Sequence, residues 1–245
     1  MIRKDELIER SPVRIFMKSI SGGLESGELG IIASPSGIGK TSVLVQIALD
    51  KLLRGDKVIH VSFNQHTDYV LAWYRDIFDE FIKKKNLEDE QDVKNEITKN
   101  RVLMKFSQEG IPVDQILRGL RAMIKDGGFS ASAIIVDGYK FSSGDRENAL
   151  KFKKFGNELG LSIWFSCNVT EEPFYDKNNI PLVIGEYSGL FDVIAVLDTK
   201  QESRNPAAPA YIDLILSRNR DVFNPRQPAL RLDPKTLLLL EDGSV

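Results

Sequence analysis

One short segment of the chain combines glycines, a lysine and a hydroxyl residue in the order that phosphate chemistry requires. It runs Ser34-Pro-Ser-Gly-Ile-Gly-Lys-Thr41, with serine where the usual pattern begins with glycine. Gly37 and Gly39 allow φ > 0, so that backbone N–H groups can surround phosphate oxygens. The Lys40 ammonium suits the β- and γ-phosphates, and the Thr41 hydroxyl suits Mg²⁺. The segment predicts a nucleoside triphosphate site contacted by consecutive residues: Ser34, Pro35, Ser36, Gly37, Ile38, Gly39, Lys40, Thr41 and Ser42.

The flanking sequence has the pattern that positions such a loop. Residues 29–33 form a short apolar run, and residues 41–53 carry apolar side chains at helical spacing. Residues 57–63 are rich in β-branched side chains and predict the next strand. A strand, a helix and a strand in close succession indicate a parallel sheet. This context favours a phosphate site over an ordinary strand–helix turn.

The same alternation continues along most of the chain. We expect further helices at 68–85, 113–125 and 145–158, and strands at 101–106, 133–136, 161–167, 191–197 and 210–217. The mixed charges of residues 86–100 predict a solvated surface segment, residues 203–209 a loop, and residues 229–241 a short hairpin. The chain is therefore expected to form one α/β domain over residues 1–245. Its expected architecture is three-layered (αβα), with a mostly parallel central sheet and a C-terminal β-hairpin.

The composition is that of an ordinary globular protein and excludes several kinds of site. With 33 basic and 35 acidic residues, the net charge of −2 gives no overall attraction for nucleic acid. Cys167 is the only cysteine, so no intrachain disulfide or cysteine-based zinc site can form, and we interpret it as a buried apolar residue. His60 and His66 have no partners at metal-ligand spacing and are expected to be structural. The charged N-terminal segment lacks a signal-peptide core, and no apolar run reaches the ~18–20 residues of a membrane span, so we expect a cytoplasmic protein without membrane contact.

The residues before the loop connect it to a known family. Ser21-Gly-Gly-Leu-Glu-Ser-Gly-Glu-Leu29 places a Gly-Gly turn and a Gly-Glu pair directly before the first strand. Together with the loop, this resembles the entry to the RecA/KaiC-like ATPases, and the order of elements is similar from about residue 15 to about residue 235. The resemblance implies a RecA-like P-loop NTPase that binds ATP and Mg²⁺. It also implies assembly, as a homo-oligomer such as a dimer or hexamer, or with a protein partner.

The resemblance implies roles for residues at the ends of later strands. Asp137 closes an apolar run and resembles the family's second Mg²⁺-coordinating motif; the alternative is a turn residue in Asp137-Gly138. Asn168 is similar in kind to the family's γ-phosphate sensor, or else it hydrogen-bonds the local loop backbone. Arg218 and Arg220 resemble the basic pair that KaiC-like proteins extend into a neighbouring subunit's nucleotide, the alternative being solvated arginines at a strand end.

Residue 64 departs from the family's pattern. Active members carry a glutamate just after the second strand, where it polarises the attacking water. This chain has Asn64 there, or Gln65 if the register shifts by one. An amide can orient a water but cannot take up its proton, and general-base catalysis typically contributes ~10²–10⁴ in rate. We therefore expect slow or absent hydrolysis unless Asp68, Glu171, Glu172 or another subunit supplies a carboxylate.

Three classes of function follow from these residues. The favoured one is a regulatory or signalling switch that binds ATP, because Asn64 replaces the catalytic acid. The second is an active ATPase that uses another acid, and the third is a nucleic-acid-stimulated recombinase or helicase. The third is least favoured because loop 170–190 is net acidic and would repel phosphates. The candidate metal ligands are Thr41 and Asp137, and the candidate catalytic residues are Lys40, Asn64, Asp137, Asn168, Arg218 and Arg220.

Overall fold

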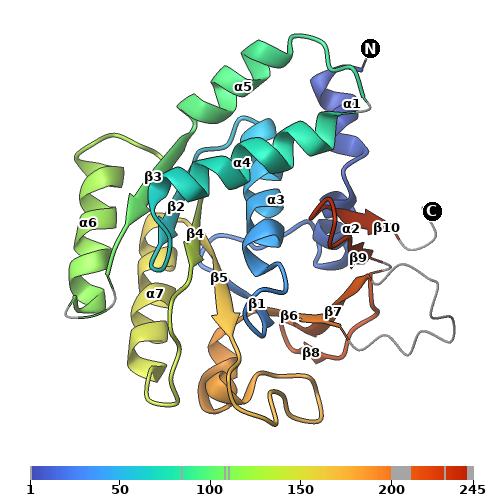
Figure 1. Cartoon of the computed structure of the whole chain (residues 1–245). Helices are drawn as coiled ribbons and strands as arrows, with labels where there is room; N and C mark the ends of the chain where they lie inside the picture. Colours follow the sequence, from blue (N-terminus) through green and yellow to red (C-terminus); the bar gives the residue numbers. More distant parts are fainter. Residues whose placement is uncertain are drawn as a thin grey trace, which may run out of the picture.

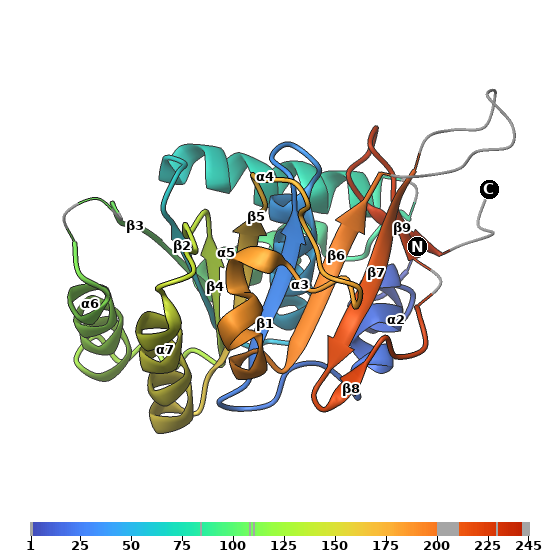
Figure 2. The same cartoon turned by 90° about the horizontal axis from the view of Figure 1, so that it is seen from below.

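The computed structural model describes residues 2–83, 85–107, 109, 111–199, 211–228 and 230–241. Within them, one sheet of ten strands runs through the molecule in the order β10-β9-β7-β6-β1-β5-β4-β2-β3, with β8 beside β7. Neighbouring strands from β3 to β6 are all parallel. They are β1 (Leu29–Ser34), β2 (Val58–Ser62), β3 (Arg101–Lys105), β4 (Ala133–Asp137), β5 (Ser162–Asn168) and β6 (Val193–Asp198). Figure 2 shows them side by side.

The remaining strands extend the sheet in the antiparallel sense. They are β7 (Ile212–Asn219), β8 (Val222–Phe223), β9 (Leu230–Leu232) and β10 (Leu239–Glu241). Strands β9 and β10 pair as a hairpin, so the hairpin expected at 229–241 is confirmed in its described part. The loop expected at 203–209 and the first residue of the strand expected at 210–217 lie outside the described residues.

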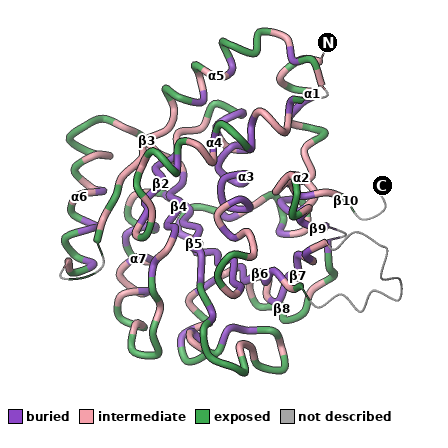
Figure 3. The backbone as a smooth tube through the Cα atoms, viewed as in Figure 1, coloured by how far each residue is buried: buried purple, intermediate pink, exposed green. Residues whose placement is uncertain are grey.

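Helices cover both faces of the sheet (Figures 1 and 2). One face carries α1 (Lys4–Glu9), α2 (Pro12–Ser19), α3 (Lys40–Leu53), α4 (Thr67–Ile82) and α5 (Glu90–Lys99), and the other carries α6 (Val113–Lys125), α7 (Arg146–Leu159) and the 3₁₀ segment η1 (Leu182–Leu190). Side chains alternate between the two cores, so Ile32 packs on the first face while Ile31 and Ala33 pack on the second. Strands β1 and β4 are buried along their whole length, as parallel strands between helices are (Figure 3). The expected α/β fold with a mostly parallel central sheet is confirmed.

Some elements differ from the expectation. Most of the segment expected to be solvated at 86–100 is exposed or half-buried, but residues 90–99 form α5, which was not expected and which buries Val93 and Ile97. Two apolar residues four positions apart give this otherwise charged helix a contact face. Helices α1 and α2 and the segment η1 were not expected. In the part of the chain that the structure describes, no helix combines the length and apolar character needed to cross a membrane.

Candidate functional site

The phosphate-loop sequence lies where the connections of the sheet diverge. It joins the carboxyl end of β1 to α3, which covers one face of the sheet. The adjacent strand β5 instead leads into η1 on the other face, and β4, the next strand beyond it, leads into α7 on that same face. Connections that leave in opposite directions open a crevice at the carboxyl ends of parallel strands, where ligands of such sheets bind.

The loop itself has left-handed turns and uncommitted donors. Gly37 and Gly39 have φ of 83° and 110°, as the sequence pattern requires. The backbone N–H groups of residues 36–41 donate to no other described backbone group. Helix α3 begins at Lys40 and directs its positive end toward the same point. Unpaired N–H groups at a helix start form a site for an anion.

Lys40 lies folded against the loop. Its Nζ donates to the carbonyls of Ser34 and Pro35 at 2.9 and 2.8 Å and lies 3.2 Å from the Ser34 hydroxyl. Burial lowers the pKa of Lys40 to about 8, against the opposing effect of Cys167 and Asp137. Among the described residues, the buried ammonium is hydrogen-bonded to neutral oxygen atoms and to no carboxylate.

Asp137 lies beside Thr41. The Thr41 hydroxyl donates to Asp137 Oδ2 at 2.8 Å, although the two residues are 96 positions apart. Asp137 is only 2% exposed and ends β4. The next peptide is fixed by a hydrogen bond of 2.7 Å from Gly138 N–H to the Ser166 hydroxyl. The structure thus brings the two candidate metal ligands together.

Asn64 lies against the end of β4. A Cβ on Gly138 would meet its Cγ at 2.5 Å, so only glycine leaves room for this amide next to Asp137. The turn that carries it is held by the Ser62 hydroxyl, which donates to the Gln65 carbonyl and accepts from the Gln65 N–H, both at 3.0 Å. The amide therefore lies beside the Asp137 end of the site, as the position of Asn64 in the sequence predicts.

Asn168 ends β5 directly beside the loop. It is the register partner of Ser34, and Val169 N–H donates to the Ser34 carbonyl at 3.2 Å. Its side chain is exposed. Among the other acids considered, Asp68 lies 3.2 Å from His66 at the start of α4. Glu172 lines a cavity of about 400 Å³ that also includes Pro35 and Ile38 of the loop, and Glu171 is exposed next to it.

Arg218 and Arg220 lie near the amino ends of the parallel strands, at the opposite end of the sheet from the loop. Strand β7 is antiparallel to β6, so its end pairs with the start of β6, at Val193 and Ile194. Arg220 makes a bidentate pair with Glu28 at 2.8 and 2.9 Å, and Arg218 donates to the Arg220 carbonyl at 2.6 Å. The interpretation as solvated arginines is wrong for Arg220, because its partner comes from the other end of the chain. The structure brings neither arginine to the loop of its own chain, and a role in a neighbouring subunit stays a prediction.

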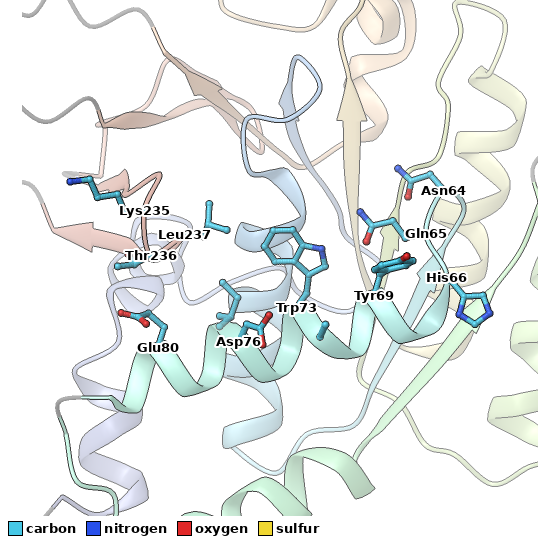
Figure 4. Close-up of a pocket in the computed structure, with 12 residues that line it drawn as sticks. Asn64, Gln65, His66, Tyr69, Trp73, Asp76, Glu80, Lys235, Thr236 and Leu237 are labelled. Carbon is cyan, nitrogen blue, oxygen red and sulfur yellow. The ribbon is translucent and has the colours of Figure 1, made fainter.

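A groove of about 750 Å³ runs from Asn64 along α4 to the turn of the C-terminal hairpin (Figure 4). Tyr69 and Trp73 contribute aromatic surface from α4, and Lys235 to Leu237 form the facing wall. Tyr69 is 69% exposed. The sequence does not indicate this groove, because the aromatic residues of α4 resemble an ordinary buried face and the hairpin is far away in sequence.

The remaining candidates for chemistry are structural, as expected. His60 is buried, with its Nδ1 3.1 Å from the Tyr74 hydroxyl, and burial lowers its pKa to about 4. His66 caps the start of α4 by accepting from Asp68 N–H. Burial raises the pKa of the Cys167 thiol to about 12, which makes it unreactive.

Comparison with family models and with curated proteins gives no assignment for this site. No protein-family model matches the chain, and no curated protein matches it in sequence.

Proposed function

We propose that this protein binds the Mg²⁺ complex of a nucleoside triphosphate at residues 34–42, and that it is a RecA/KaiC-like P-loop protein. The supporting observation is the cluster of uncommitted N–H groups at the start of α3, with the Lys40 ammonium next to it. Backbone donors and a lysine are the groups with which proteins surround β- and γ-phosphates. ATP is the proposed nucleotide because of the family resemblance.

Thr41 and Asp137 would hold the Mg²⁺ ion. Their oxygen atoms are 2.8 Å apart, and both are hard ligands of the kind that Mg²⁺ prefers. No group of three or more His, Cys, Asp or Glu residues that could hold a metal occurs in the described chain. That agrees with a Mg²⁺ ion held by one carboxylate and one hydroxyl, with phosphate oxygens and water completing its shell. Bound there, the ion would neutralise phosphate charge.

The nucleotide serves as a switch rather than as a rapidly consumed substrate. Asn64 lies against Gly138, next to Asp137, where a general base would have to act. Its amide is too weakly basic to accept a proton from the attacking water. Of the acids considered as substitutes, Asp68 contacts His66 at the start of α4, and Glu171 and Glu172 are exposed. Glu172 shares a cavity with Pro35 and Ile38 of the loop and remains the candidate for an alternative base. We propose a cytoplasmic regulatory protein that changes its assembly or its partner contacts with nucleotide state.

Binding and turnover measured on the same purified sample test this proposal. Isothermal titration calorimetry with Mg·ATP should show saturable binding, and hydrolysis should lie far below the ~1–10³ s⁻¹ of ordinary enzymes. Absence of saturable binding contradicts the proposed site. Rapid turnover contradicts the switch and leaves an active ATPase, whereas turnover that rises with single-stranded DNA indicates the recombinase or helicase class.

A substitution at residue 64 tests the cause of slow turnover. Asn64→Glu restores a carboxylate beside Asp137 and should raise hydrolysis by ~10²–10⁴ if the missing base is the limit. Asn64→Gln is the matched control, since it has the same length without the charge, and it should stay slow. Equal rates in the two variants would show that the amide is not what limits hydrolysis.

A further inference from the structure

The C-terminal hairpin is bonded directly to the helix that begins at the phosphate loop. Gln46, in α3, is only 9% exposed. Its Nε2 donates to the Leu237 carbonyl at 3.0 Å, and its Oε1 accepts from Leu239 N–H at 2.9 Å. The amide therefore pairs with the backbone of β10 as a neighbouring strand would. The same Nε2 lies 3.3 Å from the Ser42 carbonyl, so one side chain links the first turn of α3 to the hairpin.

The hairpin also packs against the loop itself. A Cβ on Gly39 would lie 2.4 Å from Leu232 Cδ2, so the Leu232 side chain covers the backbone of this residue. Leu232 is fully buried, and Gly39 has its φ in the left-handed region. Gly39 precedes Lys40 and lies within residues 36–41, whose N–H groups donate to no other described backbone group. A shift of the Leu232 side chain would therefore alter its packing against Gly39, and with it the backbone conformation that orients these N–H groups.

The hairpin is built to carry such a contact as one unit. Leu232 and Leu239 are register partners, so the residue against Gly39 and the residue bonded to Gln46 face each other. The turn is closed by a hydrogen bond of 2.7 Å from Leu237 N–H to the Asp233 carbonyl. The Thr236 hydroxyl donates to the Asp233 carboxylate at 2.8 Å. The same turn forms one wall of the groove that ends at Asn64 (Figure 4).

We propose that Gln46 and Leu232 are positioning residues through which the C-terminal hairpin holds the phosphate loop in its anion-binding geometry. The inference rests on the proposed nucleotide binding and adds to it a route by which the loop and the hairpin sense each other. Coupling between two sites is reciprocal, so a hairpin that favours nucleotide binding is itself stabilised by the nucleotide.

The first test compares two leucines of the same strand. Leu232→Ala removes the side chain against Gly39, and Leu230→Ala removes an equally buried one that does not contact that glycine. Both variants should lose stability to a similar extent. Only Leu232→Ala should weaken Mg·ATP binding in calorimetry, by about tenfold, which lies within the range of coupled sites. Equal affinities in the two variants would overturn the role of Leu232.

A second pair of variants keeps the test valid if Leu232→Ala does not fold. Gln46→Leu removes both hairpin contacts at nearly constant volume and should weaken Mg·ATP binding by about tenfold. Gln227, in the connection between β8 and β9, bonds the Leu216 backbone of β7 through the same two amide atoms, at 2.7 and 2.9 Å, away from the loop. Gln227→Leu should leave the affinity unchanged. An affinity loss of the same size in both variants would assign the effect to general destabilisation.

Hydrogen exchange on the native protein separates this inference from the proposed function. Saturating Mg·ATP should slow exchange of the Leu239 amide, and Gln46→Leu should abolish that slowing while still binding nucleotide. If the native protein binds Mg·ATP but exchange in residues 230–241 does not change, the coupling is wrong and the proposed function stands. If the native protein binds no nucleotide, both are wrong.

Discussion

At the amino ends of the parallel strands, the chain satisfies its own charges. Arg220 pairs with Glu28 through two hydrogen bonds and also donates to the carbonyls of Ile20 and Gly23. Lys153 bonds Asp192, whose carboxylate accepts from the backbone of Leu29. At the carboxyl ends, Lys40 is more enclosed, with 7% exposure, and its hydrogen-bond partners among the described residues are neutral oxygens.

We propose that the difference separates charges that stabilise the fold from a charge, Lys40, that is available to a ligand. A paired arginine lowers the free energy of the folded chain, whereas an enclosed ammonium without a carboxylate partner raises it. A bound triphosphate would give Lys40, at the carboxyl ends of the parallel strands, the negative charge that Glu28 gives Arg220 at the amino ends. Substitutions at the two edges should therefore act on different measurements.

Removing the charge at the carboxyl edge should give the largest effect. Lys40→Ala should weaken Mg·ATP binding by about a hundredfold or more, since hydrogen bonds to charged groups contribute roughly 1.5–3 kcal/mol each. The free energy of unfolding of the nucleotide-free protein should stay constant or rise, because a costly buried ammonium is lost. Calorimetry and urea denaturation measure the two quantities. A clear loss of stability with little loss of affinity would show that Lys40 stabilises the fold rather than binding the nucleotide.

Breaking the pair at the amino edge should act on stability instead. Arg220→Ala leaves Glu28 with 14% exposure and no guanidinium, so unfolding should become easier by about 2 kcal/mol, between the values for surface and buried pairs. Urea denaturation measures this loss. Lys151→Ala breaks a more exposed pair with Asp114 and should cost less stability than Arg220→Ala. A fall in ATP turnover without a stability loss would instead favour a role for Arg220 in a neighbouring subunit.

The contacts at the two ends of the parallel strands also differ in how far the sequence alone predicts them. The phosphate loop could be found because its glycines, lysine and threonine are adjacent in the chain and their chemistry is local. The Arg220–Glu28 pair spans 192 positions, and nothing near either residue identifies the other. The contacts of Gln46 with the hairpin span 191 and 193 positions, and this separation in sequence made them equally unpredictable.

Among the elements, the missed helix α2 did leave a signal. Ser11 and Pro12 form a helix start, and Val13, Phe16 and Met17 follow at helical spacing and are buried. Helix α5 had a weaker signal, with two apolar residues among many charges. The parallel strands were found because full burial on both faces makes them continuous apolar runs.

The pH dependence of nucleotide affinity gives the smallest and most specific effect. Burial lowers the pKa of Lys40 to about 8, so the nucleotide-free protein loses this ammonium as the pH rises through that value. Mg·ATP affinity should be nearly constant below about pH 7, halve by about pH 8 and be about tenfold below its low-pH value at about pH 9, since binding must then return the proton. Lys40→Arg should bind more weakly with a flat profile, because arginine does not titrate in this range.

The stability of the nucleotide-free protein should change in the opposite direction over the same pH range. The unfolded chain keeps the Lys40 proton up to about pH 10.4, while the folded chain releases it near pH 8. The unfolded state therefore binds more protons between these values, and folding becomes more favourable by about 1.4 kcal/mol per pH unit from this group. Subtracting the Lys40→Arg profile removes the contribution of other titrating groups. If affinity and stability fell together above pH 8, the lysine would be a structural charge, and the distinction between the two edges would be lost.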